Sequence, residues 1–480
     1  MKLALYRTYI KDKPYQNSMP PLGLGYLSSF VKKHCWYCET AFFRDVAQMI
    51  EWRPDIVGIS SATENFNDAV NTARRLKDEL DIPVWIGGSH ITILPHTLPE
   101  CFDVGIIGEG EETAVELVKL YYDHKPARED YSRIRGIAFH DGNKVFVGEK
   151  RELISDMDQL PFPDRECLGR EWALPFEEES HLITSRGCPY DCVFCSAPRQ
   201  WKGVRYFSPE YVCREVEFLR EKYDPREIFF FDDLFIGNVP RFRETCRIFA
   251  ERKLHEGVIF RTYGRSNIIN GEIADLFAEY NFRYIDFGFE SNSQPVLDYL
   301  NKKGVTPESN QRSIDLLYER GISIGGNFII GSPYETLEQM QETRSFVERN
   351  REKLDRVSMG PLQPIPGTRI WDYAKERGIV SEDMDWSRFI IDCDNLDLDE
   401  NFYLCEKAPR DEFMKFYEGF HQLVKEINLR GEIRKLNFDL QQSRSREQEL
   451  ESRIDTLTGS RLVRFAMKLK RDFENSSHER

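Results

Sequence analysis

Apolar residues in the first 125 positions form two kinds of pattern. Short continuous apolar runs, each typical of a buried strand, lie at 2–6, 55–61, 82–88 and 104–110. Between them, apolar residues recur at intervals of three and four, which predicts amphipathic helices at 21–31, 66–80 and 112–122. Strands that alternate with helices predict a parallel sheet with helices on both faces.

A second series of the same kind follows a connector. The connector contains a predicted β-hairpin around Asp141-Gly142 and a proline-rich linker at 160–165. Six strands are then predicted at 181–185, 227–231, 258–263, 284–289, 323–330 and 356–359. The helices predicted with them lie at 208–222, 240–254, 271–280, 306–320, 335–350 and 368–377. Six such units predict a partial parallel barrel whose active site lies at the carboxyl ends of the strands.

The predicted fold class is therefore α/β. It comprises a doubly wound, Rossmann-like domain (1–125), a hairpin connector and linker (126–175), a partial (β/α)6 barrel (176–380), a less regular subdomain (381–425) and a helical tail (426–480). In the tail, a heptad seam is formed by Ile433, Leu436, Leu440, Leu450, Ile454 and Leu457. The seam predicts either a short coiled coil, and with it self-association, or a helix packed on the body.

The end of the tail combines an apolar helix face with surrounding arginines and lysines between 459 and 480. Such a helix can lie on an anionic membrane surface, and docking on protein is an equal alternative. The chain as a whole has a net charge of -15, which argues against a nucleic-acid partner. With no signal peptide and no apolar run of about 20 residues, we expect a cytoplasmic protein, peripheral at the membrane if the tail binds there.

Three cysteines follow the first barrel strand, with the spacing Cys-x3-Cys-x2-Cys at Cys188, Cys192 and Cys195. Three thiolates can hold three irons of a cubane iron–sulfur cluster and leave the fourth iron open to a ligand. Zinc and inert thiols are the alternatives. A zinc site would need a fourth ligand in the loop, which contains none, although Cys213 and His181 lie further along the chain.

The cysteine loop, with Phe194 before its third cysteine, resembles the signature of the radical S-adenosylmethionine (radical SAM) superfamily. The resemblance implies a [4Fe-4S] cluster on Cys188, Cys192 and Cys195, with S-adenosylmethionine on the open iron. It implies reductive cleavage of S-adenosylmethionine to a 5′-deoxyadenosyl radical, and an electron donor such as flavodoxin or ferredoxin. In such enzymes the cofactors supply the difficult chemistry and the protein positions them.

The resemblance also implies which residues bind S-adenosylmethionine. They lie at strand ends of the barrel and are Phe194, Asp232, Asp233, Arg265, Glu290 and Gly331. The chain lacks the usual Gly-Gly-Glu of the second strand, so helix capping or a salt bridge is an alternative role for one of the two aspartates. A surface role is the alternative for Arg265.

The first domain ends its strands in small residues, Ser60, Ser61, Gly87, Gly88, Gly108 and Gly110. Such residues let the backbone approach a ligand, although tight turns would also select them. The motifs at 20–26, 54–60, 87–92 and 108–113 resemble the cobalamin-binding domain found ahead of some radical SAM domains. That resemblance implies cobalamin at these strand ends.

This sequence differs from those of other cobalamin proteins in the residue that would bind cobalt. The Asp-x-His-x-x-Gly motif that supplies a lower axial histidine is absent, and neither His34 nor His90 lies in that context. Its absence is usual in this radical SAM branch, and loss of cobalamin with retention of the fold is the alternative.

The expected reaction is methylation of an unactivated carbon in a small-molecule biosynthetic intermediate. A lipid-linked substrate is the expectation if the basic tail binds membranes. Radical oxidation or cyclisation without methyl transfer is the alternative within enzymes. A non-catalytic iron–sulfur electron-transfer or scaffold protein is the alternative from another class. No residue of the sequence identifies the substrate.

Overall fold

The computed structural model describes residues 1–9, 19–168, 175–389 and 402–459. The chain divides into two units, Met1–Val424 and Lys425–Arg480. The predicted basic helix at 459–480 therefore lies almost wholly outside the described residues. In the part of the chain that the structure describes, no helix is long and apolar enough to cross a membrane.

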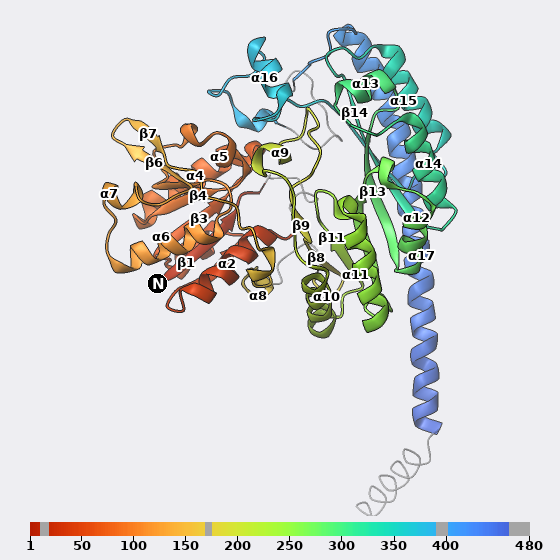
Figure 1. Cartoon of the computed structure of the whole chain (residues 1–480), viewed down its shortest axis with the longest axis horizontal. Coiled ribbons are helices and arrows are strands. Elements are labelled where there is room, and N and C mark those ends of the chain that lie inside the picture. Colours follow the sequence, from red (N-terminus) through yellow and green to blue (C-terminus); the bar gives the residue numbers. More distant parts are fainter. Residues whose placement is uncertain (10–18, 169–174, 390–401, 460–480) are drawn as a thin grey trace, which may run out of the picture. The chain divides into compact units, whose positions relative to one another are not determined.

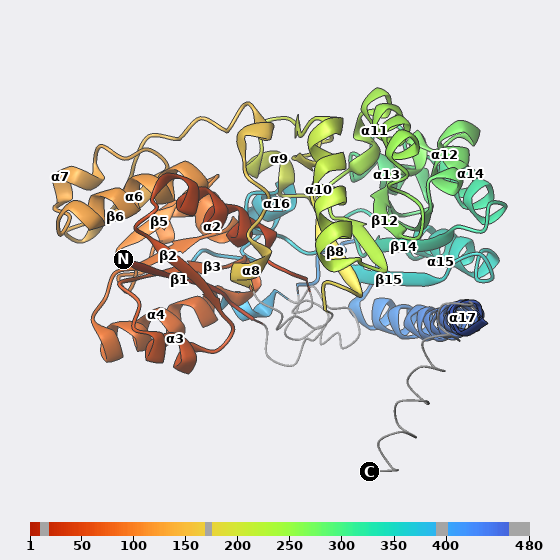
Figure 2. The same ribbon diagram turned by 90° about the horizontal axis from the view of Figure 1, so that it is seen from below.

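The first half of unit Met1–Val424 is built on a seven-stranded sheet with the order β2-β1-β3-β4-β5-β6-β7. Its first five strands are parallel and are β1 (Lys2–Arg7), β2 (Glu39–Phe43), β3 (Ile56–Ser60), β4 (Val84–Gly87) and β5 (Val104–Ile106). Helices α2 (Leu22–His34) and α6 (Glu111–Asp123) cover one face, and α3 (Val46–Trp52) and α4 (Phe66–Leu80) cover the other (Figure 2). This doubly wound sheet confirms the predicted fold class.

Two features of this sheet differ from the sequence pattern. The pattern shows no strand at 39–43, where β2 pairs with β1 as the edge strand. The predicted hairpin forms as β6 (Ile137–Asp141) and β7 (Lys144–Val147), with Gly142 at φ +61° in its turn. Because β6 pairs antiparallel with β5, the hairpin extends the first sheet. Short helices α7 (Arg128–Tyr131) and α8 (Arg165–Leu168) lie on either side of it in the sequence.

The second half is a six-stranded, wholly parallel sheet in the order β15-β14-β13-β12-β11-β8 (Figure 1). The strands are β8 (Glu179–Leu182), β11 (Glu227–Phe230), β12 (Ile259–Gly264), β13 (Phe282–Glu290), β14 (Ser323–Ile330) and β15 (Arg356–Pro361). The ribbon of β9 (Ser185–Arg186) and β10 (Arg205–Tyr206) stands beside them. Strand order follows chain order, as the predicted partial barrel requires.

Helices follow each of these strands along the chain. They are α10 (Pro209–Tyr223), α11 (Val239–Arg252), α12 (Gly271–Glu279), α13 (Gln294–Tyr299), α14 (Pro307–Tyr318), α15 (Leu337–Arg349) and α16 (Arg369–Glu376). Side chains that accept from backbone N–H groups start six of them, namely Ser208, Asn238, Asn270, Thr306, Thr336 and Thr368. Between sheet and helices lies an aromatic core in which Phe260 contacts Phe230, Phe249 and Phe282 at centroid distances of 5.1–5.3 Å.

The last described element is one helix of 50 residues, α17 (Arg410–Gly459). It spans both the end of the predicted 381–425 subdomain and the predicted heptad segment. In the second unit, Ile433, Leu436 and Leu440 of the seam are between 50% and 67% exposed. The helix predicted from 426 therefore exists and begins earlier in the chain.

Candidate cofactor site

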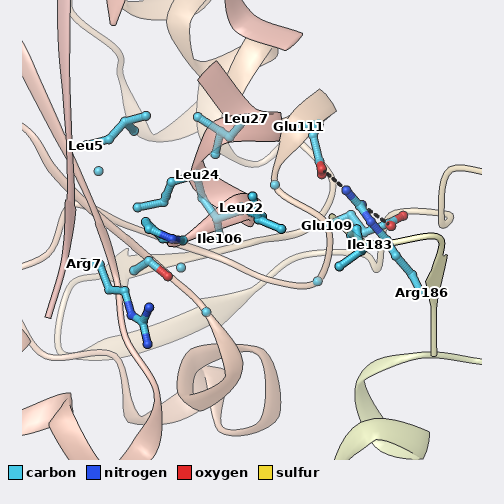
Figure 3. A pocket seen from close by; sticks show the side chains of 18 of the residues that line it. Leu5, Arg7, Leu22, Leu24, Leu27, Ile106, Glu109, Glu111, Ile183 and Arg186 are labelled. Atoms are coloured by element: carbon cyan, nitrogen blue, oxygen red, sulfur yellow. Dashed lines mark hydrogen bonds and ion pairs between the residues drawn. The ribbon is translucent and has the colours of Figure 1, made fainter. Parts of the chain in front are cut away.

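A cavity of about 690 Å³ lies between the carboxyl edges of the two sheets (Figure 3). Leu5, Arg7 and Leu22 lie on the side of the first sheet, and Ile183 and Arg186 lie on the side of the barrel. The wall at the barrel mouth adds Gly187, Trp201, Phe231, Asp233 and Tyr263. One cavity is thus bounded by the strand ends of both halves, where ligands of parallel sheets are expected.

Glycines form the wall on the side of the first sheet. Of the small residues predicted to hold cobalamin, five line the cavity, namely Ser60, Gly87, Gly88, Gly108 and Gly110. Gly108 has φ +79°, and a Cβ placed on it would meet no atom within 4 Å. The missing side chain therefore leaves open space against the backbone, which suits a broad ring that lies close to the chain. The residues present fit a corrin on this criterion.

Ser61 is the sixth of these residues, and it does not line the cavity. Its side chain is buried, and its hydroxyl donates to the Ala62 carbonyl at 3.0 Å. The Ser61 backbone supports Gly88 from behind, because a Cβ on Gly88 would lie 2.3 Å from the Ser61 carbonyl oxygen. Ser61 therefore shapes the wall through its backbone.

Histidine and cysteine are both absent from the described residues that line the cavity. His90 is instead buried against the Phe66 ring, at a centroid distance of 3.7 Å. Its Nδ1 lies 3.3 Å from the Thr63 hydroxyl, so the imidazole is engaged at the start of α5 (Ser89–Ile93). This arrangement agrees with a hydrogen-bonding role for His90.

The three cysteines lie in the loop between β9 and α9 (Ala197–Gln200), beyond the carboxyl end of β8. Gly187 starts the loop at φ +97°, and a Cβ there would lie 2.3 Å from the Gly203 carbonyl oxygen. The Val193 N–H donates to the Leu300 carbonyl at 3.1 Å, which ties the loop to the end of α13. The sequence motif is therefore anchored at the barrel mouth, as predicted.

Burial raises the pKa of the Cys195 thiol to about 11 and also raises the pKa of the Cys188 thiol. Such thiols lose their protons when a metal binds them. Within the described residues, no group of three or more His, Cys, Asp or Glu side chains is gathered to hold one metal ion. Three thiols on one short loop can supply three ligands of a cubane and leave its fourth corner open.

The two predicted aspartates after β11 face opposite ways. Asp232 is 2% exposed and accepts from the Thr184 backbone N–H at 3.0 Å and from the Ser185 hydroxyl at 2.5 Å. Burial raises the pKa of Asp232 to about 6. Asp233 lines the cavity, and burial raises its pKa as well. Asp233 can therefore meet a ligand, whereas Asp232 joins β11 to the strand that leads into the cysteine loop.

Arg265 and Glu290 both lie near the cysteine loop. The Arg265 guanidinium stacks on Tyr190 at 3.6 Å and its Nη1 lies 4.0 Å from Cys192 Sγ, so Arg265 is not a surface residue. Glu290 ends β13 with φ +65° and accepts from Lys302 Nζ at 2.5 Å. Nonglycine residues in this region of φ are strained and concentrate at functional sites.

Lys302 and Gly331 complete the surroundings of the loop. The Lys302 ammonium lies 5.7 Å from the centre of the Phe194 ring, and no sequence motif indicated this lysine. Gly331 has φ +77°, and the space its missing side chain leaves is filled by the Phe413 ring of α17, 3.0 Å from a Cβ placed there. Two reasons can therefore explain why residue 331 is a glycine: this packing, and the predicted close approach to a ligand.

A network of charged side chains in the cavity wall was also not predicted. Glu109 and Glu111 follow β5, and they pair with Arg186, which precedes the cysteine loop (Figure 3). Burial acts to raise the pKa of Glu109, but its bonds to Arg205 and Arg186 outweigh burial and hold the pKa below its ordinary value. The Gly108–Thr113 motif contains both glutamates, but it does not indicate their partners.

A second cavity of about 180 Å³ lies beside the first. Glu64 lines both cavities, and Ser196 and Gln363 line the second. Both polar atoms of the Gln363 side chain are buried and have no partner among the described residues. The predicted motif after β15 includes Gln363. Only the structure shows that the Gln363 amide is buried without a partner among the described residues.

Comparisons with known proteins agree with this geometry. The radical SAM superfamily model matches residues 182–347, and the B12 binding domain model matches residues 14–118. An uncharacterised methyltransferase, PH0819 of Pyrococcus horikoshii, is 32% identical over 386 residues, which is 77% of this chain and 81% of that protein. The chain belongs to the radical SAM superfamily, in the branch that carries a B12 binding domain.

Two further similarities come from an enzyme and a solved structure. An anaerobic magnesium-protoporphyrin IX monomethyl ester cyclase of Rubrivivax gelatinosus is 30% identical over 347 residues, 68% of this chain and 61% of that protein. The solved structure of TsrM, a radical S-adenosylmethionine methyltransferase from Kitasatospora setae, has a TM-score of 0.63 at 18% identity and covers 78% of this chain and 76% of that chain. TsrM therefore shares the fold.

The chain is accordingly an enzyme of the cobalamin-dependent radical SAM methyltransferase family. Its cofactors are a [4Fe-4S] cluster, S-adenosylmethionine and cobalamin.

Proposed function

We propose that this enzyme methylates an unactivated carbon of a small-molecule substrate. The observation that carries the proposal is the single cavity between the two sheets, with Gly108 and Gly110 on one wall and Gly187 and Asp233 on the other. A corrin on the glycine wall would face the barrel mouth, where the cysteine loop lies. In cofactor chemistry, the main contribution of the protein is to hold the reacting groups close together.

Each part of the site has a distinct proposed role. When bound, the cluster and S-adenosylmethionine supply a radical that removes hydrogen from carbon, and cobalamin supplies the methyl group. Cys188, Cys192 and Cys195 hold the cluster, while Asp233, Arg265, Glu290 and the Phe194 backbone region surround S-adenosylmethionine. The aromatic rings of Phe231 and Tyr263 line the mouth, where a bound substrate would cover them and displace water.

The second cavity is our candidate for a part of the substrate site. It adjoins the first cavity at Glu64 and reaches Ser196, directly after the last cysteine. The unpartnered Gln363 amide can both donate and accept, so it suits a small substrate with a hydroxyl, amide or amine group. A volume of about 180 Å³ accommodates only a small molecule or one end of a larger one.

Analysis of the products formed from S-adenosylmethionine tests the reaction. The protein is reconstituted anaerobically with iron, sulfide and hydroxocobalamin, reduced, and given S-adenosylmethionine with a trideuterated methyl group. We expect both 5′-deoxyadenosine and S-adenosylhomocysteine, the product that remains when S-adenosylmethionine loses its methyl group. Cys192→Ser should abolish 5′-deoxyadenosine formation because it removes a cluster ligand, whereas Cys101→Ser, in the first domain, should not.

Radical cyclisation without methyl transfer is the second candidate, because the cyclase of Rubrivivax gelatinosus is also a relative. The chain spans 61% of that protein's length. This candidate predicts 5′-deoxyadenosine without S-adenosylhomocysteine. If S-adenosylhomocysteine is absent in the cobalamin-loaded protein, methyl transfer is contradicted and cyclisation becomes the better proposal.

A further inference from the structure

Four charged side chains join the segment after β5 to the β9–β10 ribbon, and three of them, Glu109, Glu111 and Arg186, line the cavity. Arg186 donates to Glu109 Oε1 and to Glu111 Oε1, both at 2.6 Å. Arg205 donates to the two carboxylate oxygens of Glu109 at 2.9 and 3.0 Å. The side chains of Glu109, Glu111 and Arg186 are at most 7% exposed. Water cannot readily replace these partners, and removing one leaves a buried charge unpaired.

The network connects the two elements that meet the cofactors. On one side, Gly108 and Gly110 flank Glu109, and both line the cavity. On the other side, Arg186 precedes Gly187, which also lines the cavity, and Cys188. Gly187 is packed against the Gly203 carbonyl with no room for a Cβ, so the ribbon and the start of the cysteine loop are held together. The ion pairs of this network therefore link the two walls of the cavity directly.

We infer that this network couples the two cofactor sites, so that the cluster on the cysteine loop raises the affinity of the cavity for cobalamin and cobalamin stabilises the cluster. Each cofactor orders the loop that it contacts, and the network extends that order to the other loop. Thermodynamic linkage then requires the effect to be reciprocal. The inference depends on the family's cofactors and not on the reaction, so failure of the methyl-transfer test leaves it standing.

Cobalamin affinity provides the test. The dissociation constant of hydroxocobalamin is measured anaerobically by equilibrium dialysis, with the full-length protein either carrying its reconstituted cluster or freed of iron by a chelator. We expect at least about fivefold tighter binding with the cluster in place. In Glu111→Gln, which removes one partner of Arg186, the ratio of the two constants should approach one.

A neighbouring glutamate gives a matched control. Glu112 is 43% exposed and pairs with Arg151 at 3.2 Å, outside the network. Glu112→Gln removes one carboxylate from the same helical turn, so it should keep the coupling ratio of the original protein. This comparison separates loss of the network from a general change in local charge.

Iron release gives the reciprocal readout, which a merely structural role would not alter. Hydroxocobalamin should slow loss of iron to a chelator in the original protein and in Glu112→Gln, and should have no such effect in Glu111→Gln. If Glu111→Gln fails to fold by circular dichroism, Arg205→Lys replaces it, because lysine keeps the charge but cannot bond both Glu109 oxygens in a fork. Equal cobalamin affinity with and without the cluster, or an unchanged ratio in these variants, would overturn the inference.

Discussion

His90 is held without charge inside the first domain. It is 1% exposed, and burial lowers its pKa to about 3. Between about pH 6.5 and pH 3 the unfolded chain binds a proton at this histidine that the folded chain does not. Stability is therefore lost as the pH falls through this range, by up to about 1.4 kcal/mol per pH unit.

Substitution of His90 tests this linkage. His90→Gln should lower the melting temperature at pH 7.5, because stacking on Phe66 is lost. The further drop in melting temperature between pH 7.5 and pH 5 should be smaller than in the original protein. His124→Gln, at an exposed histidine, serves as the control. An unchanged pH dependence in His90→Gln would show that other groups cause the acid sensitivity.

Gly88 allows a prediction about the cavity wall. Alanine at Gly88 would be strained at φ +105°, and its Cβ would fall 2.3 Å from the Ser61 carbonyl oxygen. The ends of β3 and β4 must then separate, so Gly88→Ala should cost more than about 1 kcal/mol of stability. It should also weaken hydroxocobalamin binding at least about tenfold, which is the 1.4 kcal/mol expected of a displaced wall.

Gly271 provides the control for Gly88. It begins α12, away from the cavity, and a Cβ on it would meet no atom within 4 Å. Gly271→Ala should leave cobalamin binding as it is. Equal binding by Gly88→Ala and Gly271→Ala would show that the cavity tolerates a displaced wall.

Single residues also mark the limit of prediction from sequence. The cysteines and the cavity glycines were predictable because their chemistry or smallness is unusual at a strand end. The sequence could not show which of Asp232 and Asp233 faces the cavity. The strand before them is apolar on both faces, so no alternation reveals which side each residue faces. Lys302 was not found because its role depends on a contact with Glu290 that no local pattern encodes.

At the scale of elements, α15 begins directly after the turn that contains Gly331 at the barrel mouth. Thr336 caps its first turn and forms a reciprocal pair with Gln339. Thr336→Ala should cost about 1 kcal/mol in the free energy of unfolding, measured with urea. Ser345→Ala removes a hydroxyl within the same helix and should cost less. Equal losses of unfolding free energy in Thr336→Ala and Ser345→Ala would contradict a special role of the cap.

Many elements of both halves followed the pattern closely, because their helices have an apolar stripe and their strands have an apolar run. The predicted strand at 323–330 is the observed β14, and the predicted helix at 66–80 is the observed α4. The strand β2 was not predicted, since Glu39–Phe43 is a short edge strand paired only with β1. Pairing of the hairpin with β5 depends on long-range register, which local patterns do not contain.

At the scale of the molecule, residues 1–424 form one unit in which both sheets contribute to one cavity. We therefore expect a single calorimetric transition for this unit, despite its two sheets. Hydroxocobalamin at one hundred times its dissociation constant should add about 2.7 kcal/mol of stability and raise the transition temperature. Two transitions, of which only the first domain's responds to cobalamin, would contradict this expectation.

The chain passes between the two halves more than once. After α16 it returns to the first half, where Trp386 packs on His90 at a centroid distance of 4.7 Å and Glu382 pairs with His96 at 2.6 Å. These contacts need residues that the ribosome adds only after both sheets have been made. Until then these contacts are missing, so the growing chain passes through a stage in which a bulky cofactor meets a cavity whose two halves are held together by fewer contacts than in the finished protein.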